Sequence, residues 1–568
     1  MSTTTADVIV VGSGAAGATA ALRARADGND VIVLEAGPQV GGTTRRSSGG
    51  FWAPNNSLMR ARGIEDPRDY ALKYMARLSY PELYDPEHPT LGVPQADYDM
   101  LAVTYDRTTE AVDFLKDNGH IAIIEMQGFT GEAGDFPPYY EQPDLDKAPY
   151  GRHLGAAYDE AGVAAAAGEA LRGQGAQPTV GNQGDGRELS RQFEASMARE
   201  GIDVRVNHRV DGILKDDGEV TGVTATTPGG QETFNARKGV IFASGGFSMS
   251  EALSDDLLMG PIYGTGAAPE CRGDFIQLTK DFDVELAHTE HAWWCEVPLE
   301  LGLESRIQDW LVFIPWGDSM ITVNREGHRV VNEKALYNDR GPAHFIGGKE
   351  EGYPNRILMM VFDEGVLQNP LDWVTRWPIP MPDGSSPSVS IPGVKETDLV
   401  ISGDTLEEFA ANVEARLATL ADKTDGFDLA PGFVEGLKAE IERFNGFAAS
   451  GVDEDFQRGS VRIQTEMYGP PRPGNDKNPT MFPFRDSGPY HCILLGAGTL
   501  ETKGGPRIDP HARVVRKDGT PIPRLYGAGN CIANPTAGAY WSGGATLGTA
   551  MATGFIAGEQ ASAQEPVA

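Results

Sequence analysis

The stretch GAYWSGGATLG, residues 538–548, gathers groups that could act together on a ligand. Tyr540 carries a phenol, Trp541 an indole and Ser542 a hydroxyl group, and the surrounding glycines leave backbone amides exposed. The segment has the pattern of neither a core strand nor a surface linker. Because hydroxyl and amide groups both donate hydrogen bonds, it predicts a loop that binds an oxygen atom of a ligand.

The first forty residues predict a second binding element. An apolar run, residues 8–11, leads into Gly12, Gly14 and Gly17, and a helical segment follows. In this GxGxxG order the first glycine permits the turn, the second lets a pyrophosphate approach the backbone, and the third lets helix and strand pack closely. Glu35 ends the next strand, where a carboxylate suits a ribose hydroxyl pair. The pattern predicts a dinucleotide site.

Three further segments favour FAD over NAD. GGTTRRSSGGFW, residues 41–52, is a second turn rich in small polar donors. It resembles the loop along the flavin ring and pyrophosphate in flavoproteins of the succinate dehydrogenase/fumarate reductase type. KGVIFASGGFSMS, residues 238–250, and PIPRLYGAGNCIA, residues 521–533, have the pattern of strands that end in glycine turns, as in the FAD domains of that type.

Because these motifs stand at both ends of the chain, we expect the FAD-binding domain to be discontinuous. The expected fold is α/β, with a Rossmann-like FAD-binding domain over residues 1–284 and 487–568. Residues 285–486 contain no glycine-phosphate pattern, and we expect them to form an inserted α+β catalytic domain.

The inserted part shows helical patterns over residues 404–423 and 431–451. Asp404 or Thr405 could cap the first of these helices. Residues 369–393 are rich in proline, serine and glycine, which predicts a loop.

Composition restricts the partners. The 568 residues include 81 acidic and 48 basic side chains, a net charge of −33. This balance argues against nucleic acid and anionic membrane surfaces, which both select for cations. No apolar run is long enough for a membrane-spanning helix, and the N-terminal segment lacks the basic start of a signal peptide. We therefore expect a cytoplasmic protein.

The four cysteines, Cys271, Cys295, Cys492 and Cys531, lie far apart and show no CxxC spacing. We expect buried reduced thiols and no metal site.

Taken together, the motifs resemble those of the 3-ketosteroid Δ1-dehydrogenases, flavoenzymes that introduce a double bond into a steroid A ring. The resemblance covers nearly the whole chain. It rests on the following segments: VGSGAAG, GGTTRRSSGGFW, HAWW, NREGHRVVNEKALY, SGVDEDFQRG, ETKGGPRIDPHARVVRKDGTPIPRLYGAGN and GAYWSGG.

The resemblance implies four catalytic positions. The tyrosine after the Asn-Glu pair, Tyr337, acts as the base, and a tyrosine in a Pro-x-Tyr context, Tyr139 or its neighbour Tyr140, supports it. Tyr540 and the Gly544 amide hold the carbonyl oxygen. Trp293 and Trp294, in HAWW, would form an apolar wall of the pocket.

The resemblance also implies a set of FAD-binding residues from the glycine turns and the segments beside them. They are Gly12, Gly14, Ala15, Ala16, Gly17, Glu35, Ala36, Gly42, Thr43, Thr44, Ser48, Gly49, Gly50, Val210, Gly245, Gly246, Gly529, Asn530, Thr546 and Leu547.

These residue types suit the removal of hydrogen beside a ketone. The reaction needs a base for the α-proton, donors for the enolate oxygen and a hydride acceptor, which FAD supplies. Tyr337 must act as a tyrosinate although a free phenol has a pKa of about 10, and a hydrogen bond from Tyr139 would favour the ionised form. The rate should therefore rise toward alkaline pH.

The substrate is open because the loop departs from the family pattern. Family members commonly have Tyr-Pro-Gly where this chain has Tyr540, Trp541 and Ser542. A Tyr-x-Ser pattern also resembles the 3-ketosteroid Δ4-(5α)-dehydrogenases, and Trp541 could instead shorten the pocket for a smaller ketone such as cyclohexanone. Trp310 and Trp316 could also shape the pocket.

Two other interpretations have less support. A fumarate-type ene reductase would carry histidines where this chain has TLETKGG, and Glu501 there would repel a dicarboxylate. A non-catalytic flavin-binding scaffold would not need the tyrosines. Since neither CxxCH nor a second nicotinamide motif is present, we expect electrons to pass to an external, quinone-like acceptor.

Overall fold

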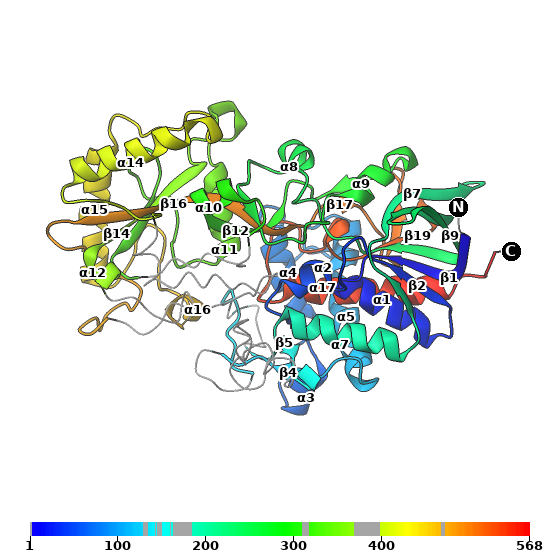
Figure 1. Ribbon diagram of the computed structural model, residues 1–568. Helices are drawn as coiled ribbons and strands as arrows, with labels where there is room; N and C mark the ends of the chain where they lie inside the picture. The colour runs from blue at the N-terminus through cyan, green and yellow to red at the C-terminus, as the bar shows by residue number, and fades with distance from the viewer. Residues whose placement is uncertain are drawn as a thin grey trace. The chain divides into compact units, whose positions relative to one another are not determined.

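The computed structural model describes residues 3–128, 134–142, 144, 150–159, 161–162, 184–308, 317–368, 398–466 and 472–567. The chain divides into two compact units (Figure 1). The first holds Met1–Leu258, Ala267–Trp293 and Glu501–Ala568, and the second holds Met259–Gly266 and Trp294–Leu500. The sequence placed the limits of the inserted part at residues 285 and 486.

Some sequence predictions fall outside the described residues. The proline-rich stretch 369–393 is one of them, and Trp310 and Trp316 are two more.

Among the described residues, the first unit is built on an eight-stranded sheet in the order β18–β19–β9–β1–β2–β6, with β8 joining β7 to β9. The strands are β1 Thr3–Val11, β2 Val31–Leu34, β6 Asp203–Arg205, β7 Arg209–Asp216, β8 Glu219–Thr227, β9 Gly230–Phe242, β18 Arg513–Val515 and β19 Pro521–Gly527. Parallel pairing of β1 with β2 and β9, and of β19 with β9, brings the ends of these strands to one edge. The glycine turns that follow β1, β9 and β19 therefore meet there.

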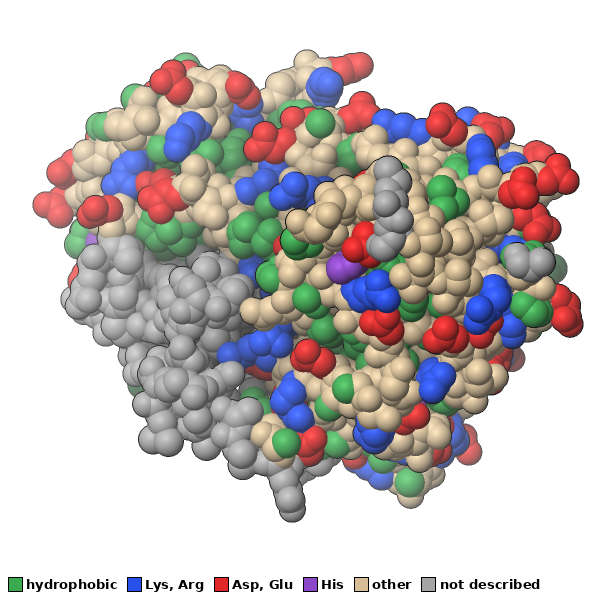
Figure 2. All heavy atoms as spheres, turned by 45° about the vertical axis from the view of Figure 1, so that its right-hand side comes forward, with side chains coloured by type: hydrophobic (Ala, Val, Ile, Leu, Met, Phe, Trp, Pro, Cys, Tyr) green, Lys and Arg blue, Asp and Glu red, His purple; other side chains and the backbone are tan. Residues whose placement is uncertain are grey.

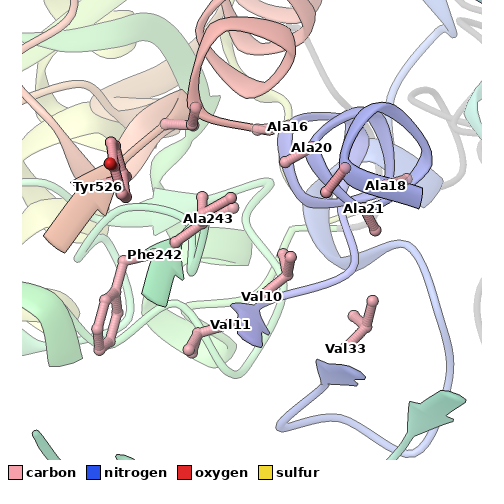
Figure 3. Packing of buried hydrophobic residues seen from close by; sticks show 14 of the residues in the cluster. Val10, Val11, Ala16, Ala18, Ala20, Ala21, Val33, Phe242, Ala243 and Tyr526 are labelled. Atoms are coloured by element: carbon pink, nitrogen blue, oxygen red, sulfur yellow. The ribbon is translucent and has the colours of Figure 1, made fainter. Parts of the chain in front are cut away.

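Helix α1, Ala15–Ala26, follows β1, so the predicted strand–turn–helix–strand order is confirmed. The last helix, α17 Ala545–Ser562, packs against α1 (Figure 1). The approach is close because Gly554 and Gly558 face it, and a Cβ on either would lie within 2.5 Å of an α1 carbonyl oxygen, that of Ala16 or Ala20. Figure 3 shows the alanines of α1 over the buried valines of β1 and β2.

A small three-stranded sheet of the first unit lies beside α17, and β11 Leu286–Ala287 pairs with β17 Gly505–Pro506 in a two-stranded sheet of the same unit. The strands of the three-stranded sheet are β3 Gly50–Trp52, β5 His153–Ala156 and β4 Ile123–Glu125, in that order. Gly548 lies where α17 passes β3, and a Cβ on it would lie 2.0 Å from Trp52 O. The remaining helices of this unit are α2 Gly42–Arg45, α3 Ser57–Ala61, α4 Arg68–Ser79, α5 Gln95–Asp117, α7 Gly186–Arg199, α8 Glu251–Leu257 and α9 Asp274–Leu278.

The second unit contains most of a six-stranded sheet centred on β16, Tyr490–Thr502, within the described part of the chain. The other strands are β10 Gly264–Thr265, β12 Ala292–Pro298, β13 Met320–Val323, β14 Ile357–Asp363 and β15 Ile401–Gly403. Its helices are α10 Leu299–Glu304, α11 Tyr337–Arg340, α12 Glu364–Gln368, α14 Leu406–Leu420, α15 Phe433–Ser450 and α16 Arg462–Glu466.

The two helices predicted in this unit are confirmed as α14 and α15. Thr405, one of the two predicted caps, is the N-cap of α14, and its side chain accepts a hydrogen bond from Glu408 N at 3.1 Å. The apolar faces of both helices pack against the buried strands β13, β14 and β16.

The four cysteines are free and buried, as expected. On the face shown in Figure 2, acidic and basic side chains are interspersed. No helix among the described residues is both long enough and apolar enough to span a membrane.

Candidate functional site

The first glycine turn is held by close backbone contacts at the end of β1. Gly12 has a φ of +101°, and a Cβ on it would lie 2.4 Å from Ala243 O, while a Cβ on Gly17 would lie 1.9 Å from Gly12 O. At Gly14 the nearest described atom to a Cβ would be Thr44 Oγ1, at 3.4 Å. Protein packing therefore requires the first and third glycines, whereas Gly14 leaves space in which a pyrophosphate can approach the backbone.

Two polar side chains are fixed around this turn. Thr44 Oγ1 accepts a hydrogen bond from Ala15 N, in the first turn of α1, at 2.9 Å. Glu35 is buried at the end of β2, where its Oε2 accepts from Ser13 N at 3.0 Å and its Oε1 from Gly37 N at 2.7 Å. Because each carboxylate oxygen can accept more than one hydrogen bond, Glu35 can also accept from a ribose hydroxyl.

The second glycine turn, residues 41–52, contacts both the first glycine turn and the buried carboxyl group of Glu501. Thr43 Oγ1 accepts a hydrogen bond from Ala268 N at 3.0 Å and lies 3.4 Å from Glu501 Oε2. Gly42 has a φ of +47°, and a Cβ on it would meet no described atom within 4 Å. This stretch of backbone is therefore open to a ligand at Gly42.

Glu501 faces the loop after β9. Its Oε1 accepts hydrogen bonds from Ser248 Oγ at 2.7 Å and from Thr502 N at 2.9 Å. A Cβ on Gly246 would lie 2.7 Å from the same oxygen, so only glycine fits above it. Burial raises the pKa of the Glu501 carboxyl. The side chain therefore supports the Gly245–Gly246 turn, a contact that the sequence did not predict.

The start of α17 presents unpaired donors. Gly544 caps this helix with a φ of +80°, and its carbonyl accepts from Trp52 N at 3.0 Å. Within the described part of the chain, the Gly544 N–H donates to no group. Thr546 Oγ1 is buried and also has no hydrogen-bond partner among these residues. A helix start attracts negatively charged ligand atoms through its free amides, so this end of α17 is suited to an anionic or carbonyl oxygen.

The turn after β19 approaches α1. Gly529 N donates to Thr553 Oγ1 at 3.0 Å, and a Cβ on Gly529 would lie 3.0 Å from Ala16 Cβ. Asn530 Oδ1 accepts from Trp293 Nε1 at 3.0 Å. The structure thus brings together predicted FAD residues from two distant segments of the sequence.

Tyr540 lies between two aromatic rings of the first unit. The Trp293 ring meets it edge-on with centroids 4.9 Å apart, and the Tyr139 ring stacks on it at 5.6 Å with an interplanar angle of 16°. Lys503 Nζ lies 4.1 Å from the centroid of the Trp293 ring and donates to Ala539 O at 2.6 Å. This buried ammonium group therefore holds the backbone immediately before Tyr540.

Trp541 contacts α4 and β3. It is fully buried, its Nε1 donates to Ser79 Oγ on α4 at 2.8 Å, and its ring lies 5.4 Å from that of Trp52. Tyr74, also on α4, donates to the Trp541 carbonyl at 2.6 Å. The indole and the carbonyl of Trp541 therefore anchor the loop to α4, and the effect of Trp541 on the pocket length stays a prediction.

Tyr139, of the two tyrosines that the sequence offered, is the one that stacks on Tyr540; it is buried, and Tyr140 is half-buried. The sequence missed His153, whose ring lies beside Tyr139. A Cβ on Gly543 would lie 2.9 Å from both His153 Nδ1 and Tyr139 Oη. The only available signal was a histidine inside an otherwise apolar strand pattern, HLGA.

Tyr337 belongs to the second unit, where it begins α11 and is buried. The neighbouring Asn338 Oδ1 accepts from Trp294 N at 3.2 Å. Arg340, at the end of α11, pairs with the buried Glu296. Groups of β12 therefore hold the residues that follow Tyr337 in the chain.

A buried charge network holds the segment before Tyr337. Glu333 receives two hydrogen bonds from Arg329, each of 2.8 Å, and one from Arg458 at 3.1 Å. Arg329 also pairs with Asp453 at 2.8 Å. The nearby guanidinium groups outweigh burial, so the pKa values of Glu333 and Asp453 are both lowered. The two motifs NREGHRVVNEKALY and SGVDEDFQRG thus form one ionic cluster.

The other predicted FAD residues lie in the first unit without a contact that tests their role. Their side chains or backbones are buried or half-buried: Ala36, Ser48, Gly49, Gly50, Val210, Gly245 and Leu547.

Known proteins resemble the chain over almost its full length. A family model described as FAD binding domain matches residues 7–547. The 4-oxocyclohexanecarboxylate 2-dehydrogenase of Sinomonas cyclohexanicum is 29% identical over 99% of this chain and 93% of its own. The 3-oxosteroid 1-dehydrogenase of Mycolicibacterium smegmatis is 30% identical over 97% of this chain and 96% of its own.

A solved structure shows the same fold. The 3-ketosteroid Δ1-dehydrogenase from Sterolibacterium denitrificans, in complex with 1,4-androstadiene-3,17-dione, superposes with a TM-score of 0.76. It is 23% identical, and the match covers 98% of this chain and 99% of that chain.

The residues present fit the cofactor that this family binds. The space at Gly14, the open backbone at Gly42 and the unpartnered Thr546 hydroxyl are all found where the sequence predicted contacts with FAD. The protein is an FAD-dependent oxidoreductase acting on CH–CH bonds. The chain belongs to the FAD-binding-domain family, within the succinate dehydrogenase/fumarate reductase flavoprotein superfamily.

Proposed function

We propose that this protein desaturates a cyclic ketone between the carbons α and β to the carbonyl, with a 3-ketosteroid as the first-choice substrate and Δ1-dehydrogenation as the reaction. The observation that carries the proposal is the setting of Tyr540. Its ring is fixed by Trp293 and Tyr139, and the unpaired Gly544 N–H lies four residues on, at the start of α17. A phenol and a free amide on one loop suit a ketone oxygen.

In this mechanism the chain's own residues handle the proton and the oxygen. Tyr337, as a tyrosinate, takes the proton from the α-carbon. Tyr540 O–H and Gly544 N–H hold the oxygen as it gains negative charge, and one such donor typically contributes ~2.7–4 kcal/mol in the transition state. Bound FAD supplies the acceptor for the hydride from the β-carbon. A hydrogen bond from Tyr139 would favour the ionised form of Tyr337.

We also propose that the second unit is the inserted catalytic domain and that a quinone-like carrier reoxidises the flavin. Tyr337 lies in this unit, and its segment is fixed by the buried Glu333 cluster and by Arg340. Such a rigid setting is what a positioned base requires.

A smaller cyclic ketone is the second candidate substrate. The relative from Sinomonas cyclohexanicum, whose name gives a 4-oxocyclohexanecarboxylate as substrate, matches over as much of the chain as the steroid enzymes do. Δ4-(5α)-dehydrogenation of a 3-ketosteroid would use the same chemistry on another bond.

Anaerobic flavin spectra would distinguish these substrates. The purified holoenzyme is mixed separately with androst-4-ene-3,17-dione, a 5α-saturated 3-ketosteroid, cyclohexanone and 4-oxocyclohexanecarboxylate. Bleaching by the 4-ene steroid with a 1,4-diene product supports Δ1-dehydrogenation. Bleaching only by another ketone keeps the mechanism and changes the substrate, and no bleaching contradicts the proposed function.

The base is tested by Tyr337→Phe. We expect the variant to bind FAD with an unchanged absorption spectrum and to lose nearly all flavin reduction by the ketone, because Phe cannot take a proton. Reduction at the wild-type rate would show that Tyr337 is not the base.

A further inference from the structure

His153 is a buried imidazole that the mechanism above does not use. It begins β5 and has 6% of its surface exposed. Its Nδ1 is buried and has no hydrogen-bond partner among the described residues. Burial lowers the pKa of His153 to about 3, so the ring is neutral at physiological pH. A neutral imidazole has one N–H donor and one acceptor nitrogen.

The position of the ring joins two segments of the site. A Cβ on Gly543, in the Tyr540 loop, would lie 2.2 Å from His153 Cε1. A Cβ on Gly50, in the second glycine turn, would lie 2.7 Å from His153 Nε2. Both glycines are therefore required by the imidazole. On a third side the ring of Phe136 meets it edge-on, with centroids 4.2 Å apart.

The Tyr139 hydroxyl borders the same space at Gly543 as the imidazole. His153 Nδ1 and Tyr139 Oη lie at the same distance, 2.9 Å, from the point that a Cβ on Gly543 would occupy. Glycine at 543 keeps a side chain out of that space, so a movement of the phenol can bring the two atoms into contact. Catalytic hydrogen bonds are commonly long without substrate and shorten in the substrate complex.

A histidine with a merely structural role would have its buried nitrogen paired, because an unmet buried donor or acceptor is unfavourable. A role as a proton store does not fit a neutral ring in this apolar setting. The remaining role for Nδ1 is a hydrogen bond to a group that approaches when the site is occupied.

We propose that His153 is a positioning residue for Tyr139, whose hydroxyl oxygen accepts a hydrogen bond from His153 Nδ1–H in the ketone-bound enzyme. This bond occupies a lone pair of the Tyr139 oxygen and does not use its O–H proton. The inference rests on the proposed function, since it assigns Tyr139 the supporting role stated there. A chain of hydrogen bonds of this kind polarises each member.

Two variants of His153 distinguish the role of Nδ1 from that of Nε2. The side-chain amide of Asn reaches the position of Nδ1, whereas that of Gln reaches the position of Nε2. The holoenzymes His153→Asn and His153→Gln are compared with wild type by stopped-flow flavin reduction, with a ketone that bleaches the wild-type flavin. We expect His153→Gln to lower the limiting reduction rate by about tenfold, the size of one hydrogen bond, with little change in the ketone's dissociation constant. His153→Asn should restore most of the rate.

A double-mutant cycle with Tyr139→Phe identifies the partner. Without the Tyr139 hydroxyl, His153→Gln should produce no further loss of rate. The proposal is overturned if both variants reduce at the wild-type rate, if Asn is as slow as Gln, if the Gln effect persists in the Tyr139→Phe background, or if both variants lose FAD from the absorption spectrum. A wild-type flavin that no ketone bleaches would instead contradict the proposed function.

Discussion

Tyr540 shows how one side chain is prepared for a role before any ligand binds. Its ring is fixed by Trp293 and Tyr139, and the backbone before it by Lys503. Trp541, the next residue, is bonded to α4 through both its indole and its carbonyl. The loop can therefore hold its donors in place with little reorganisation during the reaction, which is the condition under which such donors are most effective.

Replacement of the phenol tests this role. In Tyr540→Phe the ring contacts remain, but one of the two donors is lost. We expect the limiting rate of flavin reduction by the ketone to fall by roughly 10²–10³-fold, while the FAD content stays unchanged. Stopped-flow absorbance of the anaerobic enzyme gives the rate, and a loss of less than about threefold would assign the oxygen to other donors.

Glu501 provides a pH-dependent prediction. Because burial raises the pKa of its carboxyl, the folded protein holds this proton more tightly than the unfolded chain, whose pKa is about 4.3. The contribution of the protonated acid to stability is present below the unfolded pKa and is lost as pH rises through the folded pKa. Glu501→Gln cannot ionise, and its amide can keep the hydrogen bonds from Ser248 and Thr502.

We therefore expect Glu501→Gln to melt at a higher temperature than wild type at pH 8 and at nearly the same temperature at pH 4. Thermal unfolding of the holoenzyme at the two pH values measures the difference. Glu82→Gln, at an exposed position, is the matched control and should show no pH-dependent difference. Equal melting temperatures of wild type and Glu501→Gln at pH 8 would contradict the argument.

The junction between β3 and α17 is the element on which the site depends most. Gly544 and Gly548 allow this strand to run along the first turn of the helix, and a Cβ on either would overlap the backbone of Phe51 or Trp52. The same junction fixes the direction of the Gly544 N–H. A displaced helix would move both the ketone donor and the Thr546 hydroxyl.

Gly548→Ala tests the junction. A Cβ at 2.0 Å from Trp52 O must push the helix away, so we expect a loss of about 1–3 kcal/mol in stability and weaker FAD binding. Gly446→Ala, on α15, is the matched control. A Cβ there would meet no atom within 4 Å, and better helix propensity should stabilise the protein by about 0.5–1 kcal/mol. Chemical denaturation and FAD titration measure both, and tight FAD binding by Gly548→Ala would contradict the argument.

Elements whose signals are local could be predicted from the sequence. β1, α1 and β2 follow from an apolar run, three glycines and a helical pattern, and Thr405 was recognisable as a helix cap. Contacts between distant segments could not be predicted, because no local pattern specifies them. Asp453, for example, is buried and paired with Arg329, which lies more than one hundred residues earlier in the chain.

The candidate site was predictable to a similar extent. A family motif pointed to Tyr540, and Trp293, another residue of the quoted motifs, lies beside it. The direction of the Trp541 indole depends on Ser79, far away in the chain, and the position of His153 depends on Gly543. These contacts arise only when the fold is complete.

At the scale of the molecule, the net charge of −33 should govern the reaction with electron acceptors. Repulsion slows the approach of an anion and is screened by salt, since the Debye length falls from ~30 Å at 0.01 M to ~8 Å at 0.15 M. We expect reoxidation of the reduced flavin by ferricyanide to accelerate severalfold over this range, while reoxidation by the neutral quinone menadione hardly changes. Identical salt dependence for both acceptors would show that the net charge of the protein does not affect the rate of flavin reoxidation.

The place of α17 in the chain has a consequence for synthesis. This helix packs on α1 and β3, yet it is made more than five hundred residues after β1. At ~5–20 residues per second a ribosome takes roughly half a minute to two minutes to cover that distance. Throughout this time the apolar faces of α1 and of the sheet lack their cover, and Gly529, Asn530 and Thr546 do not yet exist. We therefore expect the first unit to bind FAD only after translation is nearly finished.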